Sequence, residues 1–199
     1  MSISPAIRYM TAEEYLAMED ASPEKHEFIG GEVYAMAGAG FAHNQIVSNS
    51  FIEIGFLLRN KSCRIYGSDL KIHVKTTSGF VYPDLSIVCH GAQFMENRGD
   101  VVTNPSVIIE VLSPDTQDFD HGKKFMLYRQ IPSLKEYILI SSMEILVEKF
   151  VRHDDAWTLT EYKSPDNSFS IETIGYQTTL AEIYRDVVFE PVNKEEPFQ

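Results

Sequence analysis

One short run limits the fold of this chain more than any other, because it places a carboxylate inside an apolar strand. Residues 107–112 read Val-Ile-Ile-Glu-Val-Leu, and Glu110 is the one polar residue among them. Apolar residues on both faces are typical of a central strand that is covered on both sides. A lone buried charge is strongly destabilising unless a partner compensates it. The chain is therefore expected to build a covered sheet that also supplies a partner for Glu110.

A second carboxylate stands at the start of another apolar run. Residues 82–88 read Tyr-Pro-Asp-Leu-Ser-Ile-Val, so a strand is predicted to begin beside Asp84. If the two strands are neighbours, Asp84 and Glu110 can share a hard divalent cation, Mg²⁺ or Mn²⁺ in its place. Such an ion can activate a water and offset charge on a phosphodiester. Each acidic residue also has a purely structural alternative. Asp84 can belong to a turn, because Pro-Asp is common in turns, and Glu110 can pair with an Arg or Lys.

A lysine is the third candidate for this site. Lys124 shares one face of a predicted helix at 121–130 with Leu127, Tyr128 and Ile131, so it is expected to point toward the sheet. There it could steady a water or a phosphate near the two carboxylates. The alternative is an ion pair with Asp120, four residues earlier, which is also the expected N-cap of the helix.

Two accessory candidates have weaker support. Asp69 lies on the polar side of a predicted strand, and it is either a further or an indirect metal ligand, or a solvated or salt-bridged aspartate near Lys71. His43 opens a long predicted helix and is either an accessory site residue or an ordinary surface histidine.

Periodicity and turn residues divide the rest of the chain into short elements. Helices are predicted at 12–19, 42–60, 121–130 and 180–187. Strands are predicted at 26–29, 32–36, 64–75, 80–89, 106–112, 136–141, 145–151, 157–163 and 169–174. Residues 91–104 are expected to be a polar connection and 194–199 a loose tail. This order predicts one α/β (α+β) domain over 1–199, a mixed sheet with packed helices and a core at about 42–142.

Composition narrows the partners and the location of the protein. The net charge of −12 argues against a general polyanion binder, although residues 55–135 hold ten Lys and Arg against eight Asp and Glu. No run is apolar and long enough for a membrane helix, and the N-terminus lacks the pattern of a secretion signal. Cys63 and Cys89 form no CxxC pair and are expected to be buried reduced thiols. These features favour a cytoplasmic protein.

The ordered motifs resemble those of the Uma-type family of predicted restriction endonucleases, within the PD-(D/E)xK nuclease superfamily. The resemblance spans roughly residues 8–187 and implies a restriction-endonuclease-like core, a divalent metal and hydrolysis of DNA. It rests on the following stretches: 27–33, Met36 with His43, 67–69, 82–84, 109–114 with Thr116, Asp120 with Lys124 and Tyr128, and 136–137.

Matched position by position, Asp84 corresponds to the aspartate of PD and Glu110 to the acidic residue of (D/E)xK. Leu112 stands where the motif lysine belongs, and the Uma-type pattern places that lysine in the following helix, where Lys124 fits. The leading hypothesis is a Mg²⁺-dependent DNA endonuclease that acts as a homodimer, since two sites cut two strands most simply. Its alternatives are a catalytically inactive nucleic-acid-binding or assembly module on the same fold, and a hydrolase of smaller phosphate esters.

Overall fold

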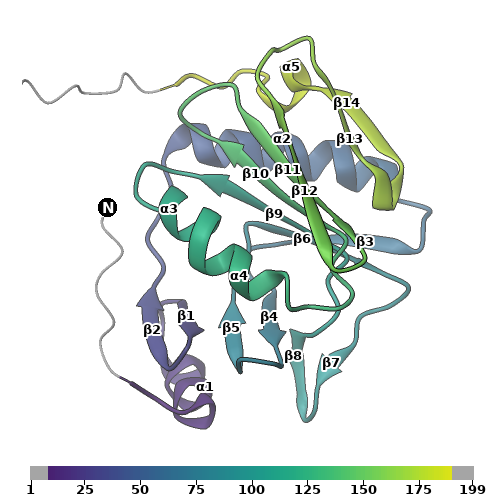
Figure 1. The fold of residues 1–199 in the computed structure, drawn as a ribbon. Coiled ribbons are helices and arrows are strands. Elements are labelled where there is room, and N and C mark those ends of the chain that lie inside the picture. Colours follow the sequence, from purple (N-terminus) through teal and green to yellow (C-terminus); the bar gives the residue numbers. More distant parts are fainter. Residues whose placement is uncertain (1–8, 190–199) are drawn as a thin grey trace, which may run out of the picture.

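The computed structural model describes residues 9–189, which form two six-stranded mixed sheets, a two-stranded sheet and several helices (Figure 1). The N-terminal sheet has the order β2-β1-β5-β4-β8-β7: β1 (His26–Ile29), β2 (Glu32–Ala35), β4 (Lys71–Val74), β5 (Gly79–Val81), β7 (Phe94–Met95) and β8 (Arg98–Val102). The central sheet has the order β12-β11-β10-β9-β6-β3: β3 (Cys63–Gly67), β6 (Leu85–Cys89), β9 (Val107–Leu112), β10 (Glu136–Ser141), β11 (Val147–His153) and β12 (Ala156–Tyr162). The strands β13 (Ser168–Ile171) and β14 (Tyr176–Thr179) form the small sheet.

The helical segments are short except for one. They are α1 (Ala12–Ala21), α2 (Phe41–Leu58), α3 (Gln117–Phe119), the π-helical turn η1 (Asp120–Lys124), α4 (Phe125–Tyr128), the 3₁₀ turn η2 (Glu172–Ile174) and α5 (Leu180–Ile183). Helix α1 begins with the capping box predicted by its sequence, in which Thr11 and Glu14 satisfy each other's backbone N–H groups. Within residues 9–189, no helix combines the length and the apolar character needed to cross a membrane.

The central sheet and its helices follow the predicted order of a helix, three strands, a helix and a strand. Helix α2 is followed by β3, β6 and β9, and α3–η1–α4 then connects β9 to β10. Strand β9 pairs antiparallel with β6 on one side and parallel with β10 on the other. The parallel pair needs a crossover, which the helical segment supplies. Strand β9 therefore lies in the middle of the sheet, as its apolar run predicts.

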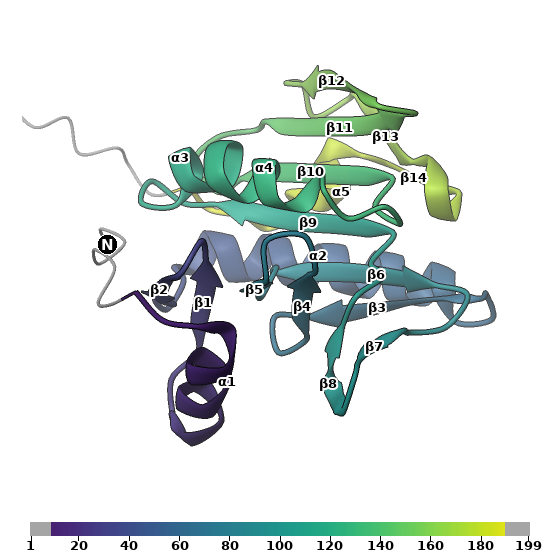
Figure 2. The ribbon, with the colours of Figure 1, turned by 60° about the horizontal axis from the view of Figure 1, so that its bottom comes forward.

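The two faces of β9 pack against different helices, as Figure 2 shows. Val107, Ile109 and Val111 belong to the apolar cluster that includes α2 and α5. Ile108 and Leu112 belong to the cluster that includes α4 and strands of the N-terminal sheet. Because side chains alternate along a strand, Glu110 shares the face of Ile108 and Leu112. Its carboxylate therefore faces the helix that carries Lys124.

The predicted strands at 64–75 and 80–89 are each broken in two, which is the main difference from expectation. The first forms β3 in the central sheet and β4 in the N-terminal sheet, and the second forms β5 in the N-terminal sheet and β6 in the central sheet. The breaks fall at 68–70 and 82–84. The alternation of apolar and polar residues does not reveal which sheet a residue belongs to. For this reason the sequence pattern predicted each segment as a single strand. Asp84 consequently lies where the chain crosses between two sheets.

Smaller differences follow from turns and pairings that the sequence pattern did not reveal. The connection at 91–104 contains the β7–β8 hairpin. The helix predicted at 121–130 starts earlier, at Gln117, and Asp120 lies inside it instead of capping it. Strand β13 ends at Ile171, β14 was not predicted, and α5 ends at Ile183. The predicted tail at 194–199 lies outside the described residues.

The two cysteines form a disulfide, so the expectation of reduced thiols is wrong. Cys63 and Cys89 are buried, as expected, but they lie directly opposite each other in the antiparallel pair of β3 and β6. They are 26 residues apart in sequence and lack a recognisable spacing motif. Only the register of the two strands brings them together.

Candidate active site

Asp84 is held against β9 from the crossing between the two sheets. Its Oδ2 accepts a hydrogen bond of 2.8 Å from the backbone N–H of Val111. In return, the backbone N–H of Asp84 donates to Oε2 of Glu110 at 3.1 Å. This reciprocal pair of bonds fixes both acidic residues at one point of the β6–β9 pair, so the structure brings together the two carboxylates that the sequence singled out.

Glu110 is almost completely enclosed, with 3% of its surface exposed. Its Oε1 accepts hydrogen bonds from Nζ of Lys124 at 3.1 Å and from the hydroxyl of Tyr128 at 2.8 Å. The compensation that a buried carboxylate requires thus comes from α4 and η1 on the facing side of the sheet. One oxygen of Glu110 faces the helix, and the other faces Asp84.

Lys124 points inward, as its position on the apolar stripe predicts. Its ammonium lies 3.1 Å from Oε1 of Glu110, 3.1 Å from Oε1 of Glu27 and 3.3 Å from Oδ1 of Asp120. The alternative contact with Asp120 is therefore also present, alongside the contact with Glu110. An ammonium has three donors, and here three carboxylates surround it. The π-helical turn that holds Asp120 and Lys124 is a form that recurs at functional sites.

Leu112, which occupies the position of the motif lysine, is buried in the apolar cluster beside α4. A lysine from the helix reaches Glu110 from the same side. Lys124 thus contacts Glu110 from the helical segment after β9, while the strand position at Leu112 packs as core.

Sequence reasoning missed the contacts of Glu27 and Tyr128 with the charge cluster around Lys124, and it placed Asp120 at a helix cap. Glu27 on β1 is buried, and its Oε1 also accepts the backbone N–H of Tyr82 at 3.1 Å. Asp120 was expected to cap a helix but is buried beside the lysine. Tyr128 was assigned to the apolar stripe, yet its hydroxyl binds Glu110. Glu27 precedes the apolar pair Phe28-Ile29 in a short predicted strand, and this pattern did not indicate Lys124 as its partner.

The accessory candidates have different outcomes. Nε2 of His43 lies 3.2 Å from Oδ2 of Asp84, so His43 joins the site from the first turn of α2. Its Nδ1 is buried without a hydrogen-bond partner among the described residues. Asp69 instead pairs with Lys25 at 2.7 Å, and its side chain is 97% exposed. The expected partner Lys71 is buried elsewhere, 4.0 Å from Asp100, and no described contact connects Asp69 to Asp84 or Glu110.

The site carries more negative than positive charge. Glu27, Asp84, Glu110 and Asp120 face one lysine and one histidine in a largely buried space. Burial raises the pKa of Glu110 to about 8, and it also raises the pKa values of Glu27 and Asp120. Burial opposes the charge of Lys124, but Glu110, Glu27 and Asp120 outweigh it and hold its pKa well above the usual value. A further cation or bound protons would balance the charge.

A histidine next to this cluster ties the helix to the sheet and predicts a pH effect. His121 Nε2 lies 2.5 Å from Oε2 of Glu148 on β11. Although burial lowers the pKa of His121, hydrogen bonds to Glu148 and the backbone raise it overall. A raised folded-state pKa stabilises the fold below the unfolded pKa near 6.5, and this stabilisation is lost as the pH rises through the folded value. The free energy of unfolding of the wild type should therefore exceed that of His121→Gln by about 1 kcal/mol at pH 6. Solvent screening keeps this difference small.

Urea unfolding of the wild type and His121→Gln at pH 6 and pH 8.5 measures this difference directly. The gap should narrow at the higher pH, and a constant gap would contradict the assigned titration. His153→Gln is the control, because His153 lies at the exposed end of β11 and outside the described ion pairs.

Comparisons with known proteins agree with this architecture. A family model named Uma2, described as "Putative restriction endonuclease", matches residues 12–181. The "Uncharacterized protein slr1290" of Synechocystis sp. (strain ATCC 27184 / PCC 6803 / Kazusa) is 33% identical over 181 residues, covering 90% of this chain and 94% of that protein. The "Uncharacterized protein sll1609" of the same organism is 36% identical over 162 residues, covering 81% and 92%.

A solved structure shares the fold. The crystal structure of "a putative nuclease belonging to DUF820" from Anabaena variabilis ATCC 29413 superposes with a TM-score of 0.75 and 17% identity, covering 90% of this chain and 99% of that chain. It confirms the predicted fold class, a mixed sheet with packed helices. The family model spans most of the chain, and both relatives exceed 30% identity. This protein therefore belongs to the Uma2 family of restriction-endonuclease-like nucleases.

Proposed function

We propose that this protein is a Mg²⁺-dependent endonuclease that hydrolyses DNA at the site formed by Asp84, Glu110 and Lys124. One observation carries the proposal. The hydrogen bonds from Asp84 to Glu110 and from Val111 to Asp84 join two acidic residues in an otherwise apolar sheet. A purely structural glutamate needs only Lys124 and Tyr128, whereas this arrangement also keeps a second carboxylate beside it.

The side chains present fit a hard divalent cation. Among residues 9–189, no group of three or more His, Cys, Asp or Glu is arranged to hold a metal ion. Mg²⁺ is usually held by only one or two carboxylates, with waters and substrate phosphate oxygens completing its shell. Asp84 and Glu110 are such a pair, and the excess of negative charge around them would be offset by the ion. When bound there, Mg²⁺ would supply charge neutralisation at phosphorus and acidify a water.

The other residues of the site would hold these carboxylates in place. Tyr128 and Lys124 both donate to Oε1 of Glu110, which leaves Oε2 on the side of Asp84. His43 contacts Oδ2 of Asp84 at the partly exposed edge of the site. Because the ammonium of Lys124 is surrounded by three carboxylates, we assign it as a positioning residue for Glu110. This role replaces the one in the sequence-based hypothesis, in which the lysine acted on water or phosphate.

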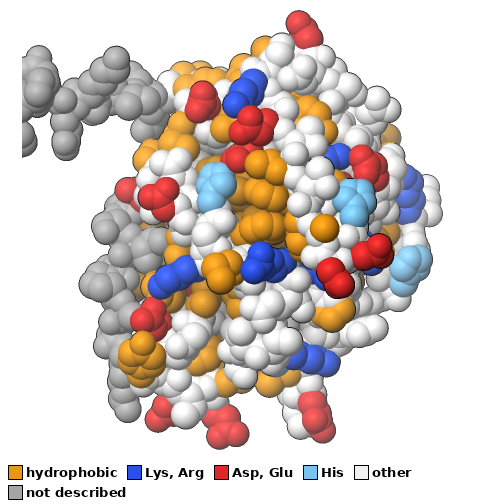
Figure 3. All heavy atoms as spheres, viewed as in Figure 1, with side chains coloured by type: hydrophobic (Ala, Val, Ile, Leu, Met, Phe, Trp, Pro, Cys, Tyr) orange, Lys and Arg blue, Asp and Glu red, His pale blue; other side chains and the backbone are white. Residues whose placement is uncertain are grey.

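The surface bears on how the substrate would bind. On the face viewed in Figure 3, acidic and basic side chains are interspersed around a central strip of hydrophobic ones. With a net charge of −12, non-specific attraction to the DNA backbone is weak. Recognition would therefore depend on contacts near the site, and we expect the affinity for DNA to depend only weakly on salt concentration, because few phosphates would be neutralised by Lys or Arg.

Plasmid cleavage tests the proposed function. Wild-type protein should nick supercoiled DNA with Mg²⁺ or Mn²⁺ and lose this activity in EDTA, and Asp84→Asn should nick more than tenfold more slowly. Asp69→Asn is the matched control, since the same change falls on an exposed aspartate outside the site. Equal nicking by wild type and Asp84→Asn would reject the site. Binding of DNA without any metal-dependent cleavage would instead favour the inactive binding module.

We extend the proposal to a homodimer formed through α2. Ile52 and Phe56 lie one helical turn apart, and their side chains are exposed although large and apolar. Large exposed apolar side chains grouped on one face are typical of interaction surfaces. Sedimentation velocity should give a dimer for the wild type and a monomer for Phe56→Glu. Phe94→Glu, an exposed phenylalanine on β7, is the control and should leave the mass unchanged.

A further inference from the structure

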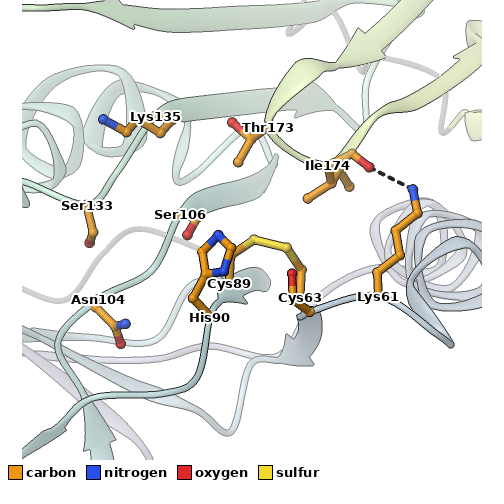
Figure 4. Close-up of a pocket in the computed structure, with 11 residues that line it drawn as sticks. Lys61, Cys63, Cys89, His90, Asn104, Ser106, Ser133, Lys135, Thr173 and Ile174 are labelled. Carbon is orange, nitrogen blue, oxygen red and sulfur yellow. Dashed lines mark hydrogen bonds between the residues drawn. A yellow bond between two sulfur atoms is a disulfide. The ribbon is translucent and has the colours of Figure 1, made fainter.

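A second site lies at the opposite end of β6 from Asp84. A cavity of about 700 Å³ opens there between the start of β3, the end of β6 and the segments that lead into β9 and β10 (Figure 4). Asp84 directly precedes β6 and Cys89 ends it, so roughly 16 Å of extended strand separates the cavity from the acidic site. Its volume falls within the range of small-molecule sites.

The charged side chains in the wall of this cavity are both basic. Lys61 and Lys135 line it, and no aspartate or glutamate does. Nζ of Lys61 donates to the backbone carbonyl of Ile174 at 2.9 Å, which holds that side chain across from η2. Within the described part of the chain, no carboxylate pairs with Lys61 or Lys135. In a protein with a net charge of −12, such a wall is suited to a small anion.

Both sulfur-bearing residues of the disulfide also line this cavity. Cys63 and Cys89 are largely buried in the sheet, yet both contribute to the cavity wall. His90, which follows Cys89 in the chain, also lines the cavity. Figure 4 shows the disulfide between Lys61 on one side of the pocket and Ser106, Ser133 and Lys135 on the other. A molecule bound there would lie next to the two disulfide-bonded cysteines.

We propose that this cavity binds small anionic thiols and that the Cys63–Cys89 disulfide exchanges with them. The thiolate of the ligand attacks one Sγ, the S–S bond breaks, and the other cysteine leaves as a thiolate that takes a proton from solvent. A second thiol molecule then attacks the ligand sulfur of the mixed disulfide. Two ligand thiols are oxidised to one small disulfide, and the protein disulfide is reduced to two thiols.

The rates of reduction by three thiols of different charge test this proposal. The probes are 3-mercaptopropionate (anionic), 2-mercaptoethanol (neutral) and 2-aminoethanethiol (cationic). Protein thiols are counted by alkylation and intact mass, and each rate is divided by that of the same thiol with 2-hydroxyethyl disulfide to remove intrinsic reactivity. At low salt, the normalised rate of the anionic thiol should exceed that of the cationic one about tenfold. The net charge of the protein alone would give the opposite order.

Variants and competitors assign this preference to the cavity. In the double variant Lys61→Gln/Lys135→Gln, the normalised rates of the anionic and cationic thiols should become about equal. The control Lys75→Gln/Lys163→Gln removes two lysines outside the lining and should leave the preference for the anionic thiol unchanged. Succinate, which bears carboxylates but no thiol, should slow reduction by 3-mercaptopropionate, because it occupies the same cavity. If the double variant misfolds, Lys135→Gln alone and added salt at about 0.5 M provide the same test, because each should reduce the preference for the anionic thiol.

Three results would overturn the proposal. They are equal normalised rates for the three thiols, a preference that persists in the double lysine variant, and two alkylatable cysteines in protein purified without reductant.

Discussion

Lys124→Met should destabilise the protein by about 3–5 kcal/mol at pH 7, the largest stability effect we expect from one substitution at the site. Its ammonium lies within 3.3 Å of carboxylate oxygens of Glu27, Glu110 and Asp120. Methionine fills a similar volume but leaves these buried groups without a counter-charge. Urea unfolding measured by circular dichroism gives the loss directly.

The neighbouring lysine provides a matched control. Lys123 lies in the same π-helical turn, but its side chain is 59% exposed and contacts Tyr34 and Glu32 at the surface. Lys123→Met should therefore cost no more than about 1 kcal/mol. Equal losses for the two variants would mean that the buried charge cluster is not what Lys124 stabilises.

The penalty in Lys124→Met should also depend on pH in a defined direction. Burial already raises the pKa values of Glu27, Glu110 and Asp120, and the variant loses the ammonium that most strongly opposes that rise. Acids with a raised folded-state pKa bind protons more tightly in the folded state, so the variant regains stability as the pH falls. The gap to the wild type should shrink between pH 7 and pH 5. A gap that widens on acidification would contradict the charge imbalance.

Glu110→Gln should lower metal-dependent cleavage by about 10²–10³-fold while changing stability by only about 1 kcal/mol. Glutamine can still accept from Lys124 and Tyr128, but it removes one negative charge and leaves the N–H of Asp84 without its acceptor. Cleavage should fall much more than stability because the charge of Glu110 contributes more to binding the proposed ion than to stabilising the fold. Plasmid nicking and calorimetric titration with Mn²⁺ provide the activity and binding measurements.

A second buried glutamate provides the control for this variant. Glu136 lies on the neighbouring strand β10, is equally buried, and accepts the backbone N–H groups of Glu172 and Thr173. Glu136→Gln also removes one buried charge and leaves one backbone donor unpaired, so its effect on stability should be similar. It should leave cleavage and Mn²⁺ binding unchanged. Loss of activity in both variants would show that general weakening of the sheet explains the result.

Local patterns in the sequence predicted the individual elements well. The apolar run around Glu110 became the central strand β9, and the Thr11–Glu14 signature became a capping box. The hairpins β1–β2 and β10–β11 also formed where expected. These features depend on residues that are close in sequence, so their physical causes are present in a short window.

Long-range pairing set the limits of those predictions. Alternation continued through 64–75 and 80–89, yet the chain turns at 68–70 and 82–84 and divides each segment between two sheets. The disulfide depends on the register that places Cys63 opposite Cys89. Glu27 reaches Lys124 only because β1 and the helix after β9 meet near the same sheet face. None of these contacts leaves a periodic or spaced signal in the chain.

The sequence by itself determined that a carboxylate had to lie inside a covered strand, because a run as apolar as 107–112 is stable only in the interior. It also determined that Lys124 would face that strand, because helical spacing fixes which side chains share a face. Only the tertiary structure decided that Asp84 sits at a crossing between two sheets and that three acids share one ammonium. Those facts depend on segments distant in the chain meeting at one point, and on how the buried charges there offset one another.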